Sequence, residues 1–325
     1  MHMIGHHHEF IQCDLRKMLG YRTPAFFYDL TRGIQRHNPI NNLLVVAGRE
    51  RAWLTTAFSR LRRSDVEAAL ASAPLRITGE VSTGAQDHFY LETQAALAVP
   101  GEDGTLRVSS STQHPTEVQN EVAAVLGLGA HEIVCEVPRM GGGFGGKESQ
   151  ATPFACLAAL AAFHTGRPAK VWLSRERDMR ITGKRHPFAY EYDVGFDDTG
   201  RITGLKLQMA ANCGFSADLS GPVADRAVFH ADNAYYLSDV EIASYRCKTN
   251  TQSHTAFRGF GGPQGVAAIE NILEDIAARL KLDAYEVRRR NIYEGENCST
   301  HYGQPVKNNV LPELFDQLYE NSGYA

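Results

Sequence analysis

The chain has 325 residues, 43% of them hydrophobic and 22% charged, the composition of a globular protein with one large domain or two smaller ones. A formal net charge of −4 and an isoelectric point near 6.4 indicate no basic surface for nucleic acid, so no nucleic-acid partner is expected. The longest apolar run, 154–163, is about half of the roughly 20 residues that a membrane span needs. We therefore expect no membrane partner and a cytoplasmic protein.

The cysteines are far apart in the sequence and include no CxxC pair. Neither a zinc site nor an iron–sulfur cluster is therefore encoded locally, and we expect reduced, mostly buried thiols. The six positions are Cys13, Cys135, Cys156, Cys213, Cys247 and Cys298.

Residues 1–64 differ from the rest of the chain, with scattered histidines, an arginine-rich end and only short apolar patches. The run His6, His7 and His8 has no carboxylate or cysteine at ligand spacing, so a solvated terminus is favoured over a metal site. We expect 1–64 to be an atypical segment, disordered or non-native, and 65–325 to form the functional domain.

Beyond residue 64, hydrophobic periodicity and turn residues predict a mixture of strands and helices. Ser64 is the expected N-cap of the first helix and Asp283 that of the last. Because the elements do not alternate strictly, the pattern favours an α+β fold with mixed sheets and packed helices. In order, the predicted elements are a helix at 65–73, a hairpin of strands 89–99 and 105–110, a helix at 116–126, a strand at 132–137, a helix at 154–163, a strand at 170–173, a hairpin of strands 190–196 and 202–209, and helices at 264–280 and 283–290.

The most unusual stretch is 140–148, which reads MGGGFGGKE. So many glycines lose a great deal of chain entropy on folding, which indicates a backbone that approaches something closely or is left-handed. The stretch lies between a predicted strand and a predicted helix, where backbone amides can converge on an anion. We expect it to bind a large ligand.

A phosphate-binding P-loop is one alternative, because Gly141, Gly146 and Lys147 have the G-x-x-x-x-G-K spacing. Glu148 then stands where Ser or Thr should hold the magnesium ion, and its carboxylate would repel the phosphates. A nucleotide triphosphatase is therefore disfavoured. A tight glycine turn without a ligand is the other alternative.

A second glycine-rich stretch, 255–265, reads TAFRGFGGPQG and opens into a predicted helix. Both stretches combine glycines, aromatic residues and a cation, which favours a ligand cradle made of two loops. Arg226 and Gln113 lie in neighbouring polar segments. Taken singly, Arg226 is more typical of a surface cation and Gln113 of a turn residue.

Together these segments resemble the molybdenum-binding (large) subunit of the xanthine dehydrogenases, within the xanthine oxidase family of molybdenum hydroxylases. The resemblance extends over essentially all of 65–325, whereas 1–64 does not resemble the preceding part of that subunit. The segments that carry it are 84–92 (GAQDHFYLE), 110–115 (SSTQHP), 139–148 (RMGGGFGGKE), 182–188 (TGKRHPF), 226–233 (RAVFHADN), 248–265 (KTNTQSHTAFRGFGGPQG) and 286–291.

The resemblance implies a molybdenum–molybdopterin cofactor. Gln113 would hydrogen-bond an oxygen ligand of molybdenum, and the backbone around Gly143, Phe144 and Arg258 would approach the metal and the pterin dithiolene. Glycines allow such close approach, and amide donors stabilise negative oxo and thiolate ligands.

The resemblance further implies that Glu148 and Arg226 bind and polarise a purine, xanthine or hypoxanthine, on its way to urate, and that Phe260 stacks on its ring. Aldehyde oxidases generally do not keep both the Glu and the Arg. Carbon monoxide dehydrogenases have a cysteine in the loop that here runs from Ala256 to Phe260. A purine substrate is therefore preferred to an aldehyde or carbon monoxide.

In this family the general-base glutamate, a second stacking phenylalanine and much of the pterin pocket lie downstream of the matched region. The iron–sulfur clusters and FAD are expected on partner subunits or domains, in a complex that forms homo-oligomers. We therefore expect the first half of the cofactor region, weakly active or inactive alone. A non-catalytic truncated scaffold and an aldehyde oxidase-like hydroxylase are the alternatives.

Overall fold

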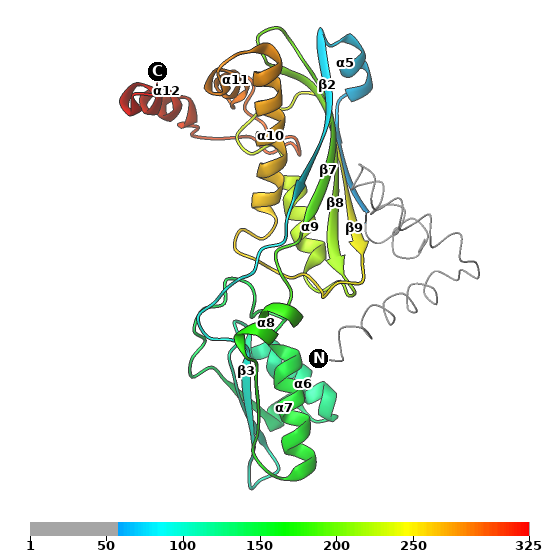
Figure 1. Cartoon of the computed structure of the whole chain (residues 1–325), viewed down its shortest axis with the longest axis vertical. Helices are drawn as coiled ribbons and strands as arrows, with labels where there is room; N and C mark the ends of the chain where they lie inside the picture. The colour runs from blue at the N-terminus through cyan, green and yellow to red at the C-terminus, as the bar shows by residue number, and fades with distance from the viewer. Residues whose placement is uncertain (1–57, 325) are drawn as a thin grey trace, which may run out of the picture.

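The computed structural model describes residues 58–324, which form two lobes along the long axis of the molecule (Figure 1). The large lobe comprises 58–83 and 188–324, and the small lobe comprises 95–172. The segments 84–94 and 173–187 connect them and are called the neck below. Each lobe is a sheet with helices packed on it, so the predicted α+β fold is confirmed.

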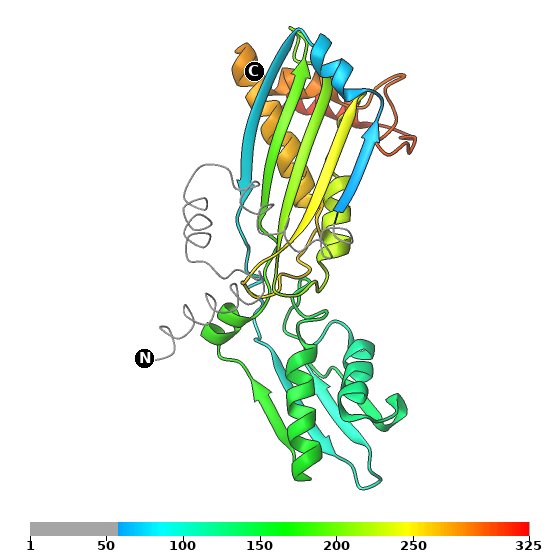
Figure 2. The ribbon, with the colours of Figure 1, turned by 90° about the vertical axis from the view of Figure 1, so that its right-hand side faces the viewer.

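The large lobe contains a five-stranded sheet in the order β1-β9-β8-β7-β2, in which only β8 and β9 pair in parallel. Turned by 90°, the view shows these strands side by side (Figure 2). In sheet order the strands are β1 Phe58–Arg63, β9 Val240–Lys248, β8 Ile202–Gly214, β7 Phe188–Phe196 and β2 Leu75–Thr83.

Helix α10 covers the large sheet because its apolar residues recur at helical spacing. Ile269, Ile272, Leu273 and Ile276 are all fully buried in a core shared with β7, β8 and β9. The other helices of this lobe are α5 Val66–Ser72, α9 Ser220–Phe229, α11 Ala284–Asn291 and α12 Leu311–Ser322, and α10 itself spans Gly262–Leu280.

The small lobe has a four-stranded sheet in the order β5-β4-β3-β6, with two long helices packed on it through a core rich in alanine and valine. The strands are β5 Ile133–Glu136, β4 Leu106–Ser110, β3 Ala95–Pro100 and β6 Ala169–Trp172; the helices are α6 Pro115–Leu126, the 3₁₀ turn η1 Ala130–Glu132 and α7 Thr152–Thr165, with α8 Arg175–Ile181 in the neck.

The structure corrects several predicted boundaries. Phe58–Arg63 forms β1 and pairs with β9, so the folded part begins before Asp65, inside the segment 1–64 that we expected to be atypical. Residues 1–57 lie outside the described residues. Asp65, and not Ser64, caps α5 by accepting a hydrogen bond from the Ala68 amide. The strand predicted at 89–99 begins only at Ala95, because the residues before it belong to the neck.

Over 58–324, no helix is long and apolar enough to cross a membrane. Of the cysteines in this range, Cys213 and Cys247 are buried, and the other three are partly buried thiols.

Candidate functional site

The two glycine loops meet where the lobes join. The first, 140–148, follows β5 of the small lobe, and the second, 255–265, leads into α10 of the large lobe. The Arg258 amide donates a 2.9 Å hydrogen bond to the Phe144 carbonyl. A Cβ at Gly145 would lie 2.7 Å from the carbonyl carbon of Ala256, so only glycine permits this contact. The structure thus joins two loops that are more than a hundred residues apart.

Gln113 lies against the first loop, just after β4. Its side-chain oxygen accepts hydrogen bonds from the amides of Gly145 (2.9 Å) and Lys147 (3.2 Å). The backbone amide of Gln113 donates a 2.7 Å hydrogen bond to the Lys147 carbonyl. These contacts use the oxygen end of the side chain and leave Nε2 as a donor with no partner among residues 58–324. Gln113 is therefore suited to donate to an oxygen acceptor at the solvent side of the loop.

The two loops share a local geometry. Phe144 has a φ of 54° and Phe260 a φ of 48°, and each is followed by two glycines. A left-handed phenylalanine costs about 1–3 kcal/mol, and such residues concentrate at functional sites. Phe144 remains 49% exposed in this strained position. Both loops therefore hold an aromatic side chain in a left-handed conformation, followed by glycines that are mostly buried.

Lys147 does not occupy the position of a P-loop lysine. Its side chain is fully buried and makes its hydrogen bonds to the protein itself. A phosphate at the loop surface would therefore find no lysine to bind. This geometry adds to the mismatch at Glu148 as an argument against a nucleotide triphosphatase.

Glu148 is partly buried at the end of the first loop. Burial raises its pKa, the nearby carboxylates of Asp218 and Glu117 raise it further, and His114 opposes them. A carboxyl group with a raised pKa both donates and accepts protons more readily near neutral pH. An open cleft of about 500 Å³ is lined not by Glu148 itself but by the residues that follow it and by several others, namely Glu117, Ser149, Gln150, Pro153, Phe154, Ile181, Phe215, Ser216, Asp218, Leu219 and Ser253.

Arg226 lies on α9, which packs against the second loop. Its guanidinium is exposed and donates a 3.2 Å hydrogen bond from Nε to His230 Nε2. In the part of the chain that the structure describes, no ion pair joins it to Glu148 or to any other carboxylate. The guanidinium thus keeps its charge and most of its donors for a ligand.

Asp218 binds residues at both glycine loops, although nothing in the sequence predicted a role for it. Its carboxylate accepts hydrogen bonds from Ser149 (2.7 Å), Gln150 (2.5 Å) and Thr255 (3.1 Å). One side chain just before α9 therefore holds the end of the first loop and the start of the second. No local motif could have identified it, because its partners are distant in sequence.

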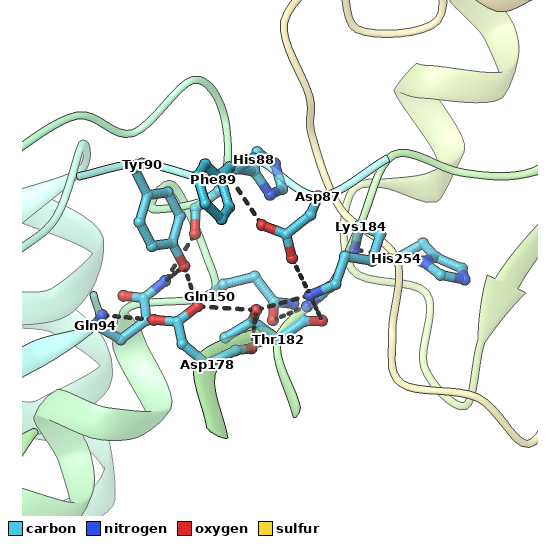
Figure 3. Close-up of polar contacts among 12 residues, drawn as sticks. Asp87, His88, Phe89, Tyr90, Gln94, Gln150, Asp178, Thr182, Lys184 and His254 are labelled. Carbon is cyan, nitrogen blue, oxygen red and sulfur yellow. Dashed lines mark hydrogen bonds and ion pairs between the residues drawn. The ribbon is translucent and has the colours of Figure 1, made fainter. Parts of the chain in front are cut away.

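A buried polar network in the neck supports the same loops (Figure 3). Asp178 accepts 2.7 Å hydrogen bonds from the Tyr90 hydroxyl and the Gln94 amide. Nε2 of Gln94 in turn donates a 2.8 Å hydrogen bond to the Gly146 carbonyl. Lys184 forms a 3.0 Å ion pair with Asp87. The two neck segments, 84–94 and 173–187, thus support the first loop.

The arrangement fits an anionic, oxygen-bearing cofactor. A Cβ at Gly143 would lie 2.4 Å from the Gln113 side-chain oxygen, so the glycine makes room for that side chain. Gln113, with its free Nε2 donor, and the left-handed Phe144 are both exposed, and Gln113 is bonded to the loop that carries Phe144. Amide donors and glycine backbone of this kind suit negative oxo and thiolate groups.

Comparison with known proteins identifies the domain. The family model of the molybdopterin cofactor-binding domain matches residues 52–292. The chain is 45% identical over 264 residues to xanthine dehydrogenase of Dictyostelium discoideum, covering 81% of this chain and 19% of that protein. It is 44% identical to xanthine dehydrogenase/oxidase of Mus musculus, covering 82% of this chain and 20% of that protein. The chain thus spans about a fifth of the curated relatives that it matches.

Solved structures agree with this assignment of the fold. An aldehyde oxidoreductase from Desulfovibrio gigas superposes with a TM-score of 0.74 at 25% identity, covering 81% of this chain and 29% of that chain. Quinoline 2-oxidoreductase from Pseudomonas putida 86 superposes with a TM-score of 0.73 at 25% identity, covering 82% of this chain and 35% of that chain.

Proposed function

Because the chain belongs to the family of molybdopterin cofactor-binding domains, we propose that it forms the substrate-binding side of a molybdenum hydroxylase acting on xanthine or hypoxanthine. The observation that carries this proposal is the joining of both glycine loops, one ending at a partly buried carboxyl, Glu148, and the other packed against α9, whose Arg226 has no carboxylate partner in 58–324. Identities of 44–45% to xanthine dehydrogenases support the purine over an aldehyde.

The residues that would hold the cofactor are Gln113 and the backbone around Gly143, Phe144 and Arg258. The molybdenum–molybdopterin group, when bound, supplies the oxidation chemistry. Gln113 would donate its Nε2 hydrogen bond to an oxygen of that group, because its carbonyl side is held by loop amides. The other three residues contribute close approach of the main chain.

Glu148 and Arg226 would bind opposite parts of the purine. A carboxyl with a raised pKa can exchange a proton with a ring nitrogen. A guanidinium stabilises negative charge that develops on a ring oxygen. Phe260, held in a left-handed conformation at the second loop, would stack on the ring. Electrons would leave through iron–sulfur and FAD groups on other domains or partner subunits, because the matched relatives are about five times longer than the match.

The test uses the natural full-length protein with xanthine and an aldehyde compared as substrates. Glu148→Ala and Arg226→Met should each lower xanthine turnover about a hundredfold, equivalent to roughly 3 kcal/mol of barrier, with molybdenum content unchanged. Glu121→Ala and Arg107→Met, both exposed positions away from the loops, are the matched controls and should leave turnover unchanged.

Two results would contradict the proposal. Faster oxidation of the aldehyde than of xanthine would indicate an aldehyde oxidase-like hydroxylase. Absence of molybdenum from protein purified from its natural source would indicate a non-catalytic scaffold.

A further inference from the structure

Lys147 carries an ammonium group in a place with no solvent exposure. Burying a charge is costly unless it is fully hydrogen-bonded. Its Nζ donates to the Glu92 carbonyl (2.8 Å), the Ser111 hydroxyl (2.6 Å) and the Met140 carbonyl (2.5 Å). It also stands 4.5 Å from the centre of the Tyr90 ring, in a cation–π contact. All three donors of the ammonium are thus used inside the protein.

The three acceptors come from different parts of the chain. Glu92 belongs to the neck, Ser111 follows β4, and Met140 begins the first glycine loop. One side chain therefore ties the start of the loop to the neck and to the segment that carries Gln113. Burial lowers the pKa of Lys147 to about 8, so the ammonium is largely protonated at neutral pH.

The main chain of Lys147 binds Gln113 directly. The Lys147 amide donates 3.2 Å to Gln113 Oε1, and the Lys147 carbonyl accepts from the Gln113 amide (2.7 Å) and the Thr112 hydroxyl (3.1 Å). The anchored side chain and these backbone contacts belong to the same residue. The hydrogen bonds of the ammonium therefore fix the same residue that holds the Gln113 side chain.

We propose that Lys147 is a positioning residue whose buried ammonium fixes Gln113 and the backbone of 143–146 for the cofactor, and that it binds no ligand itself. The role in catalysis rests on the proposed function, whereas the anchoring of the loop does not. Loss of the ammonium would remove the side-chain donor of the Glu92 carbonyl and leave the Met140 carbonyl with only the Ser111 hydroxyl, which would loosen the start of the loop.

The first test is amide hydrogen exchange on the full-length, cofactor-free protein. Lys147→Met should raise exchange at the Gly145 and Lys147 amides, which donate to Gln113 Oε1, by about tenfold or more. Lys206→Met is the control, because Lys206 is partly buried on β8 and pairs with Glu67 in the large lobe, away from Gln113 and from the neck network. The control should leave exchange at those two amides unchanged. Unchanged exchange in Lys147→Met, or an equal rise in Lys206→Met, would overturn the proposal.

If Lys147→Met does not fold, a less disruptive variant can still test the anchoring of the loop. Ser111→Ala removes one acceptor of the ammonium and should raise exchange at the same two amides by a smaller factor. Unchanged exchange in a folded Ser111→Ala protein, when Lys147→Met is unfolded, would contradict the anchoring.

The catalytic part of the proposal is tested by a double-mutant cycle on xanthine turnover. If Lys147 acts through Gln113, Lys147→Met should lower kcat with little change in KM, and the double variant with Gln113→Ala should be no slower than Gln113→Ala alone. Additive losses would overturn action through Gln113. If the wild-type protein does not oxidise xanthine at all, the proposed function fails, and the exchange experiment still decides the anchoring.

Discussion

The two glycine loops look alike in sequence but use their glycines differently. In the first loop a Cβ at Gly141, Gly143 or Gly146 would meet side chains, those of Glu92, Gln113 and His88. Those glycines make room for side chains that hold the loop or line the site.

In the second loop Gly261 and Gly265 meet backbone, whereas Gly259 meets the ring of Pro263. A Cβ at Gly261 would lie 2.1 Å from the Val223 carbonyl oxygen, and one at Gly265 would lie 2.3 Å from that of Ala227. Both carbonyls belong to α9, so these glycines let α10 and α9 pack closely. The comparison indicates that Gly141, Gly143 and Gly146 make room for side chains at the site. Gly261 and Gly265 instead permit close backbone packing, as Gly145 does where the two loops meet.

The largest expected effect comes from adding a methyl group to the second loop, which tests whether its glycines are needed for the packing of α9 and α10. Gly261→Ala combines a φ of 100° with a backbone clash, so it should lower the free energy of unfolding by more than about 3 kcal/mol. Denaturant unfolding followed by circular dichroism measures the loss. Gly104→Ala, with a φ of 83° and open space around its Cβ, should cost only about 1 kcal/mol. Equal losses would remove the role of the α9 contact.

The same methyl group in the first loop should act on the site. Gly143→Ala meets only the flexible Gln113 side chain and has no positive φ, so the free energy of unfolding should fall by less than about 1 kcal/mol. Displacement of Gln113 should still lower xanthine turnover by about tenfold to a hundredfold. Gly84→Ala, with open space around it, is the control. Turnover within twofold of wild type in Gly143→Ala would contradict the distinction between the loops.

Asp218 tests whether the two loops depend on one another. Asp218→Ala removes the acceptor of Ser149 and Gln150, which directly follow the first loop, and of Thr255, which begins the second. It should lower the free energy of unfolding by about 2 kcal/mol. It should also raise amide exchange at Arg258, whose amide donates to Phe144. Asp103→Ala, which breaks hydrogen bonds only within its own turn, should leave that exchange unchanged.

The smallest expected effect is the fall in the free energy of unfolding at acidic pH. Burial, together with the positive charge of Lys184, lowers the pKa of His254, just before the second loop, to about 4. The neighbouring His186 is also kept neutral by burial, with its pKa lowered to about 3. The unfolded chain therefore binds more protons than the folded one between pH 6.5 and about 4. Stability is lost as the pH falls through this window, by up to about 1.4 kcal/mol per pH unit for each histidine.

His254→Asn should reduce this slope by about one proton, measured by denaturant unfolding at pH 6.5, 5.5 and 4.5. The exposed His164→Asn serves as the control and should leave the slope unchanged. If the wild-type stability does not fall with pH over this range, His254 is not held neutral in the fold.

The sequence by itself determined the features that depend on local pattern. The helices at 116–126, 154–163 and 264–280, both hairpin strand pairs and the Asp283 cap were predicted because periodicity and capping are read within a few residues. The positions of both glycine loops also came from sequence, since clustered glycines are visible without a structure.

Only the tertiary structure decided which groups meet. The pairing of β1 with β9, the left-handed Phe144 and Phe260, and the role of Asp218 depend on partners far away in the chain. Lys147 is the clearest case, because its spacing favoured a phosphate ligand while its side chain turns inward to three acceptors from separate segments. Spacing along a chain gives residue types and order, but the direction of a side chain is set by which acceptors the fold places beside it.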